Sequence, residues 1–234
     1  TYPEKLKSWD ARFNGVEVFS LHTNAKKMNP VLFAADALWS FRSYGDLLLA
    51  NYFVRPEENL RKFDELAARR KLTHFAGADA HSNIGFHLVG DDAGNRLVKL
   101  KFDDYASVFR LARNYVLLEK EKPVTEENLL AALRDGRSFV GIDAWGEARG
   151  FSFTANDKTM GDELILNGRI TLKATAPLAA RFVILRDGAK VFEASGTEIN
   201  FEATEKGAYR TEVYLDALGF TEMPWIMSNP IYLR

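Results

Sequence analysis

The hydrophobic periodicity of the chain changes near Gly150, and this change constrains the fold more than any other feature. Before it, short β-branched and aromatic runs alternate with stretches whose apolar residues recur at helical spacing. After it, the helical spacing disappears and short runs with alternating apolar residues follow one another. The sequence therefore predicts an α/β unit over residues 1–147 and an all-β unit, an Ig-like sandwich, over residues 148–234.

In the first unit, strands and helices are expected to alternate, which favours a mostly parallel sheet or barrel. Asn29 before Pro30 is typical of a helix start, and Gly136 is typical of a helix end. The helix at 55–71 carries mixed charges, which we expect on a solvated face. The expected strands are 14–21, 72–79, 114–120 and 138–145. One or two helices are expected over 29–53, and single helices over 55–71, 102–113 and 125–136.

The second unit is expected to be built from short strands with an aromatic core. Asp187-Gly188 lies between two alternating runs and predicts a two-residue hairpin turn. The expected strands are 169–176, 181–186, 189–195, 198–204, 208–216 and 230–234. The aromatic residues mostly fall at alternating positions, so we expect them to pack between the sheets rather than to form a carbohydrate-binding platform.

Composition excludes some functions and leaves the compartment open. The 234 residues carry 31 basic and 32 acidic side chains, so the net charge of −1 does not indicate nucleic acid or an anionic membrane as a partner. No apolar run reaches the roughly 20 residues of a membrane span, so we expect a soluble protein. The absence of cysteine excludes disulfides and thiolate chemistry, and it is compatible with either cytoplasm or periplasm.

Asp79 and His81, in the stretch FAGADAHSNIG, are the first candidates for a functional site. Residues two apart on a strand point the same way, so both side chains are expected at the C-terminal end of the strand over 72–79. Parallel α/β proteins bind ligands at that end. A carboxylate with an imidazole suits zinc, manganese or iron, although a D-x-H pair alone is as readily a polar turn.

Four segments, in order, resemble the PHP (polymerase and histidinol phosphatase) superfamily. GADAHS (77–82) resembles its late metal motif, and GVEVFS (15–20) resembles the strand that precedes that motif. LLAALRDGRSFVG (129–141) resembles the segment that follows it. PWIMSNPIYLR (224–234) resembles the closing segment of bacterial PHP proteins with a C-terminal β-sandwich.

The resemblance implies a metal-dependent phosphoesterase with a distorted (β/α)7 barrel, of which this chain would be the C-terminal part. In the intact family site, two or three divalent metals activate a water and hold the phosphate oxygens of a small phosphorylated substrate. Asp79 and His81 would be metal ligands by this resemblance.

The chain departs from the family pattern at its start. The H-x-H strand and further ligands that open the family are absent, and TYPEK places Tyr2 where the family has a histidine. Two explanations fit. Either this is a fragment whose partner is the missing N-terminal segment or a second chain, or it is a metal-poor, inactive relative that serves as a binding or scaffold module. Because two ligands seldom hold a catalytic metal, we expect the chain alone to bind metal weakly and to turn over poorly.

Four more residues are candidates for metal or substrate contact. Glu17 lies within the strand over 14–21, where a structural hydrogen bond is the ordinary alternative to metal binding. His22 follows the end of that strand, where an ordinary loop histidine is the alternative. His87 follows the Asp79 motif and is a candidate for a phosphate contact. Arg137 could bind a phosphate through two hydrogen bonds, but ion pairing near the end of the preceding helix fits it better.

Overall fold

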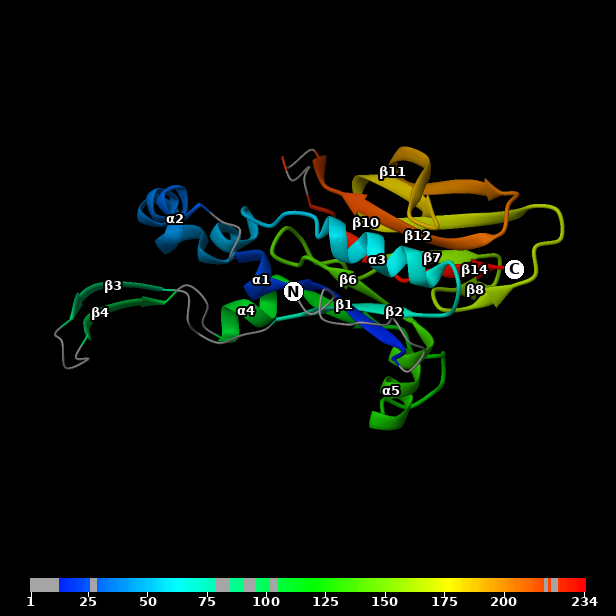
Figure 1. The fold of residues 1–234 in the computed structure, drawn as a ribbon, viewed down its shortest axis with the longest axis horizontal. Coiled ribbons are helices and arrows are strands. Elements are labelled where there is room, and N and C mark those ends of the chain that lie inside the picture. Colours follow the sequence, from blue (N-terminus) through cyan, green and yellow to red (C-terminus); the bar gives the residue numbers. More distant parts are fainter. Residues whose placement is uncertain are drawn as a thin grey trace.

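The fold was analysed in a computed structural model, which describes residues 13–25, 29–78, 85–90, 96–101, 105–216, 219 and 223–234 (Figure 1). The helices are α1 (Leu21–Ala25), α2 (Pro30–Ala50), α3 (Glu57–Ala67), α4 (Tyr105–Leu111) and α5 (Glu126–Asp135). The strands of the first half are β1 (Gly15–Ser20), β2 (Thr73–Gly77), β3 (Gly85–Gly90), β4 (Arg96–Lys101), β5 (Arg113–Val116) and β6 (Ser138–Gly141). The remaining strands are β7 (Ser152–Ala155), β8 (Lys158–Thr159), β9 (Glu163–Leu164), β10 (Ile170–Arg186), β11 (Ala189–Ala203), β12 (Gly207–Tyr214), β13 (Ile226–Ser228) and β14 (Ile231–Leu233).

The helix boundaries follow the sequence signals closely. Asn29 caps α2 through its side-chain oxygen, with Pro30 as the first helical residue. Thr125 caps α5 in the same way, and Gly136 ends that helix with a φ of 78°, a left-handed conformation that glycine adopts without steric cost. These helix predictions are confirmed.

The expectation of a mostly parallel sheet is met only in part. β1 and β2 pair in parallel, but β5 pairs with β6 in the antiparallel sense and β6 pairs likewise with β13. β5 and β6 thereby belong to a sheet of ten strands that is otherwise built by the C-terminal half. The chain between β5 and β6 forms α5, as in a parallel β-α-β unit, but it returns beside β5 in the opposite direction.

The C-terminal strands form one curled sheet rather than the two separate sheets of the predicted sandwich. The expected runs 169–176 and 181–186 join into the 17-residue β10, and 189–195 and 198–204 join into the 15-residue β11. The pairing of the two long strands continues past two register shifts, one between Thr175 and Ala180 and one between Ile184 and Leu185. The hairpin at Asp187-Gly188 is confirmed, with both residues at positive φ.

The helix α3 lies between the β1–β2 pair and the strands β10 and β12 (Figure 1). Leu60, Phe63 and Ala67 are buried, as their spacing predicts. Asp64 is buried too, at 6% exposure, so the prediction of a solvated charged face is wrong at this position. Asp64 lies four residues after Leu60, on the inner stripe, and its position faces β12.

Asp64 belongs to a buried cluster of charges that joins α3 to β12. The guanidinium of Arg210 donates two hydrogen bonds to the Asp64 carboxylate, at 2.6 and 2.7 Å, and a third to Glu212, at 2.6 Å. Arg55 donates to both oxygens of Glu212 at 2.9 and 2.7 Å. Two cations thus meet two anions, and each charge is paired despite its burial.

The pKa shifts in this cluster follow from its charges. Burial alone would raise the pKa of Glu212, but Arg210 and Arg55 outweigh it and lower that pKa to about 2. Burial alone would lower the pKa of Arg210, and the two carboxylates raise it instead. The Glu212 contribution to stability is therefore present above the ordinary pKa of 4.5 and is lost as the pH falls toward 2.

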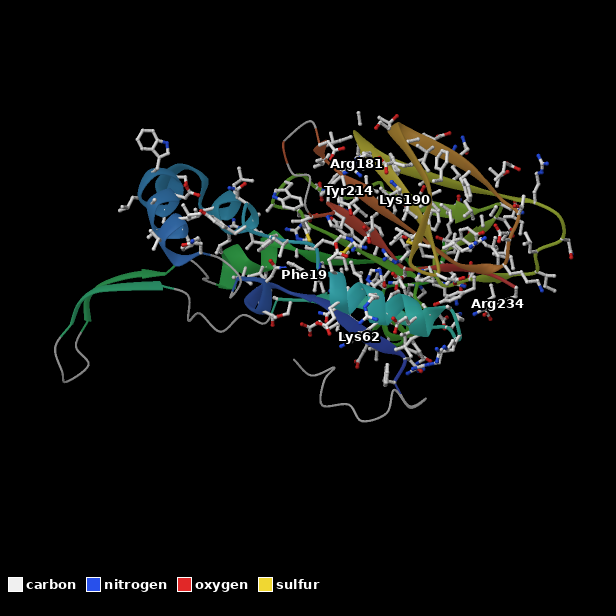
Figure 2. All side chains as sticks on the ribbon, turned by 45° about the horizontal axis from the view of Figure 1, so that its top comes forward. Phe19, Lys62, Arg181, Lys190, Tyr214 and Arg234 are labelled. Carbon is white, nitrogen blue, oxygen red and sulfur yellow. The ribbon has the colours of Figure 1, made fainter. Side chains whose placement is uncertain are left out.

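Tyr214 closes the cluster on its outer side. Its hydroxyl donates to Glu212 at 2.6 Å, and Arg181 lies over its ring at 4.3 Å from the centroid (Figure 2). Arg181 also pairs with Asp216 at the surface, at 2.5 Å. The aromatic ring therefore separates the buried charges from an exposed pair.

Replacing Arg210 by methionine should lower the free energy of unfolding by about 3–5 kcal/mol, because Asp64 and Glu212 would stay buried without their shared cation. Urea denaturation followed by circular dichroism measures this change. Arg181→Met is the matched control, since it removes a partly exposed pair and should cost less than about 1 kcal/mol. Equal losses in the two variants would contradict the importance of the buried cluster.

Candidate functional site

The parallel pairing of β1 with β2 brings two candidate segments to one edge. Ser20 and Gly77, the last residues of the two strands, are register partners. The chain continues from Ser20 directly into α1, where His22 lies, and from Gly77 through Ala78 to Asp79. Both segments therefore leave the same end of the strand pair, the end at which parallel sheets bind ligands.

Glu17 lies over the end of β2. A methyl group built on Gly77 would come within 2.7 Å of the Glu17 carboxyl carbon and of one of its oxygens. The carboxylate therefore rests directly against the Gly77 backbone, and a larger residue at this position would have to push the Glu17 side chain aside. Glu17 is exposed, so its charge stays hydrated.

The side chain of Asn24 holds α1 in place. Its amide nitrogen donates to the carbonyl of Val54 at 2.8 Å, and its oxygen accepts the Val54 N–H at 3.1 Å. Asn24 is 4% exposed. The short helix that carries His22 is thereby fixed to the segment leading into α3.

The second edge of β2 is bonded by side chains instead of by a strand. The N–H of Thr73 donates to Asn14 on the β1 side, so the residues that alternate with Thr73 present their backbone groups to the opposite edge. At that edge, the N–H and the C=O of each of three residues are hydrogen-bonded by a single side chain, with donor–acceptor distances of 2.7–3.0 Å. The three pairs are Leu72 with Tyr232, His74 with Asn229, and Ala76 with Asn114. We call this row the side-chain ladder.

His74 is structural. It is fully buried, its ring meets Phe63 edge-on at 5.0 Å, and its Nε2 lies 2.8 Å from the carbonyl oxygen of Ser228. Since a carbonyl only accepts, Nε2 carries the proton, and Nδ1 has no hydrogen-bond partner among the described residues. Burial lowers the pKa of His74 from 6.5 to about 4, against the opposing effect of the Ser228 carbonyl.

The predicted site residues are described to different extents. Asp79, His81 and Tyr2 lie outside the described residues. His22 falls in α1 and His87 in β3, opposite Lys99 of β4, but their side chains are also outside the described part. The structure thus brings together Glu17, the end of β2 and the start of α1.

Arg137 lies away from this edge and has other partners. Its guanidinium donates to Glu119 at 2.6 Å and to Asp162 at 3.3 Å. Its Nε is buried without a hydrogen-bond partner in the described part of the chain. Glu119 and Asp162 therefore already pair with Arg137. Binding of a phosphate by Arg137 stays a prediction.

Sequence reasoning missed the asparagines that fix the edge. Asn24, Asn114 and Asn229 each bond one backbone residue through both amide groups. Asparagine is depleted in strands, so Asn114 within the run NYVLL was a signal that its amide has a specific partner. The partner itself is far in sequence and is not readable from the pattern.

The described residues give two further findings on metals and membranes. Among them, no three histidine or acidic side chains lie together closely enough to hold a metal ion. Within the same residues, no helix combines the length and the apolar character needed to cross a membrane.

Comparisons with known proteins give no family. No protein-family model matches the chain, and no curated protein matches it. The crystal structure of CHIR-AB1 is similar to 36% of this chain and 95% of its own, with 17% sequence identity and a TM-score of 0.28. A likeness this weak shows neither a shared fold nor a shared function.

The buried His74 should make the protein less stable in mild acid. Because its folded pKa lies below its unfolded value, the unfolded state binds more protons between pH 6.5 and 4, and stability falls by up to about 3 kcal/mol over that window. In His74→Gln this part of the pH dependence should disappear, although the variant starts less stable at pH 7. Urea denaturation at pH 7, 6, 5 and 4 tests this. Parallel pH curves for the two proteins would exclude a buried neutral His74.

Proposed function

We propose that the chain is the C-terminal part of a PHP-type metal-dependent phosphoesterase, which hydrolyses a phosphate mono- or diester. The pairing of Ser20 with Gly77 is the observation that supports this best. The two strands end at the same edge, and in the sequence Asp79 and His81 follow the end of β2 while His22 follows the end of β1. The four sequence segments that resemble the PHP superfamily include β1 and the stretch that begins at Gly77, the last residue of β2.

The residues at this edge suit a divalent metal. Asp79 and His81 offer a carboxylate and an imidazole, and Glu17 offers a second carboxylate, which lies beside Gly77. A bound metal would supply an activated water and charge stabilisation at the phosphate oxygens. In this proposal Asp79 and His81 hold the metal, and Glu17 contributes negative charge or accepts a proton nearby.

Two features support a partner that completes this edge. Among the described strands, β1 pairs only with β2, which leaves its second edge available for another strand. The helix α2 also exposes large apolar side chains, since Val31, Leu38 and Trp39 are 74%, 90% and 92% exposed. Exposed apolar surface of this kind is typical of sites that pack against further polypeptide. The partner in this proposal is an N-terminal segment of the same enzyme or a second chain.

Asp79→Ala should abolish metal binding by the purified chain. Wild-type protein is titrated with Mn²⁺, with free Mn²⁺ followed by electron paramagnetic resonance, and hydrolysis of p-nitrophenyl phosphate and bis(p-nitrophenyl) phosphate is measured in the same samples. We expect weak, saturable binding and slow turnover in the wild type, because few ligands are present, and neither in the variant.

Asp157→Ala is the control, since it removes an exposed carboxylate from the turn between β7 and β8 and should leave metal binding unchanged. Binding that is equal in wild type, Asp79→Ala and Asp157→Ala would contradict the proposed site. No binding and no turnover in the wild type would instead favour the inactive binding or scaffold module.

A further inference from the structure

The sequence contains two Asn-Gly pairs, Asn14-Gly15 and Asn167-Gly168, and their surroundings differ. Asparagine is a thermolabile residue, because the backbone nitrogen of the next residue can attack its side-chain amide. A following glycine favours this attack, since it carries no side chain beside that nitrogen and its backbone rotates freely. Whether an Asn-Gly pair reacts in a folded protein therefore depends on how firmly the fold holds it.

Asn167 and Gly168 lie in the segment between β9 and β10, and the fold does not hold them. Both residues are exposed, and neither has a hydrogen bond to another residue within the described ranges. Gly168 has a φ of 84°, and a methyl group built on it would meet no atom within 4 Å beyond its chain neighbours. The torsion angles of this pair can therefore change without breaking a contact.

Asn14 is exposed too, but β2 holds its pair in place. The carbonyl oxygen of Asn14 accepts the Thr73 N–H at 2.9 Å, and Gly15 is the register partner of Thr73. A methyl group built on Gly15 would lie 3.1 Å from the Phe75 ring. Ring closure requires rotation about the bond between the Cα and the carbonyl carbon of asparagine. At Asn14 this rotation would break the hydrogen bond to Thr73, so the strand must open before the reaction.

We propose that Asn167 is a site of spontaneous deamidation in the folded protein and that the β1–β2 pairing protects Asn14. The backbone nitrogen of Gly168 forms a bond to Cγ of Asn167, and the Cγ–Nδ2 bond breaks. Ammonia leaves with the proton from the Gly168 nitrogen, and a cyclic imide remains. Water then opens the imide at either of its carbonyl carbons, which gives aspartate or isoaspartate. In sum, water is consumed and ammonia is released, and no oxidant or reductant takes part.

The modified protein should stay folded, so that the product accumulates. On one side of the pair, the Leu166 N–H donates to the Arg234 carbonyl at 2.9 Å, and on the other side β10 begins at Ile170. The new carboxylate, and the extra main-chain carbon of isoaspartate, fall between these two points. The reaction therefore adds a negative charge beside Arg169, whose side chain is exposed, and removes no hydrogen bond to a described residue.

The experiment follows both pairs in one sample. The 234-residue chain is incubated at pH 8, digested briefly with trypsin at pH 6 and analysed by liquid chromatography with mass spectrometry. Asn14 lies in the tryptic peptide 13–26 and Asn167 in 159–169, and fragmentation distinguishes Asn14 from Asn24. We expect conversion at Asn167 to be about tenfold faster than at Asn14, where a hydrogen bond must open first. Incubation at pH 6 should slow both, because the backbone nitrogen must lose its proton.

Unfolding and one substitution provide the controls. In concentrated urea the two rates should agree within about twofold, because each asparagine is then followed by an unrestrained glycine. Asn167→Gln should give no product at this position over the same period, since the longer side chain closes a less favourable ring, and conversion at Asn14 should be unchanged. The proposal is overturned if Asn167 does not react or reacts no faster than Asn14 in the folded protein, or if the difference persists in urea. Conversion at Asn167 that only follows a loss of structure, measured by circular dichroism, would overturn it as well.

Discussion

The hydrogen-bonded ion cluster of Arg210 with Asp64 and Glu212 joins the two halves of this chain. It ties α3 to β12, and α3 in turn packs against β1. Buried charges are costly unless each is paired, and here the costs are offset only when all partners are present. The position of α3 therefore depends on these ion pairs, because losing one partner would leave a buried charge unpaired. The position of the β1–β2 pair depends on them through α3.

A second constraint acts on β2, which has one strand neighbour and needs partners for its other edge. Buried backbone groups must be paired, and here three side chains perform the task of a strand. A side-chain amide carries N–H donors beside a carbonyl acceptor, so it can bond the N–H and the C=O of one residue as a neighbouring strand would, which explains why asparagine recurs in this role. This arrangement lets β2 lie along the large sheet without pairing with one of its strands.

The sequence predicted local structure well and long-range pairing poorly, for physical reasons. The helix α5 was predicted with its ends because Thr125 and Gly136 act on their own neighbours. The antiparallel return of β6 beside β5 was not, since the direction of a strand after a helix depends on which edge of the sheet is free. Asp64 was assigned to solvent because it is charged, although its spacing from Leu60 placed it on the buried stripe. Its cation lies 146 residues away, beyond any local pattern.

The same reasoning bears on β12, whose residues are all buried although its sequence alternates. Arg210, Glu212 and Tyr214 share one face, which an isolated sheet would turn to water. That face is instead covered by α3, so the polar residues pair with one another and with Asp64. These charges are thus balanced because the two halves pack together. The ion pair of Asp64 with Arg210 holds α3 in place, and α3 packs against β1, which carries Glu17 and leads into α1. The arrangement of the β1–β2 pair in the first half therefore relies on charges contributed by the second half, and separating the halves near Gly150 should cost this pair its position as well as its stability.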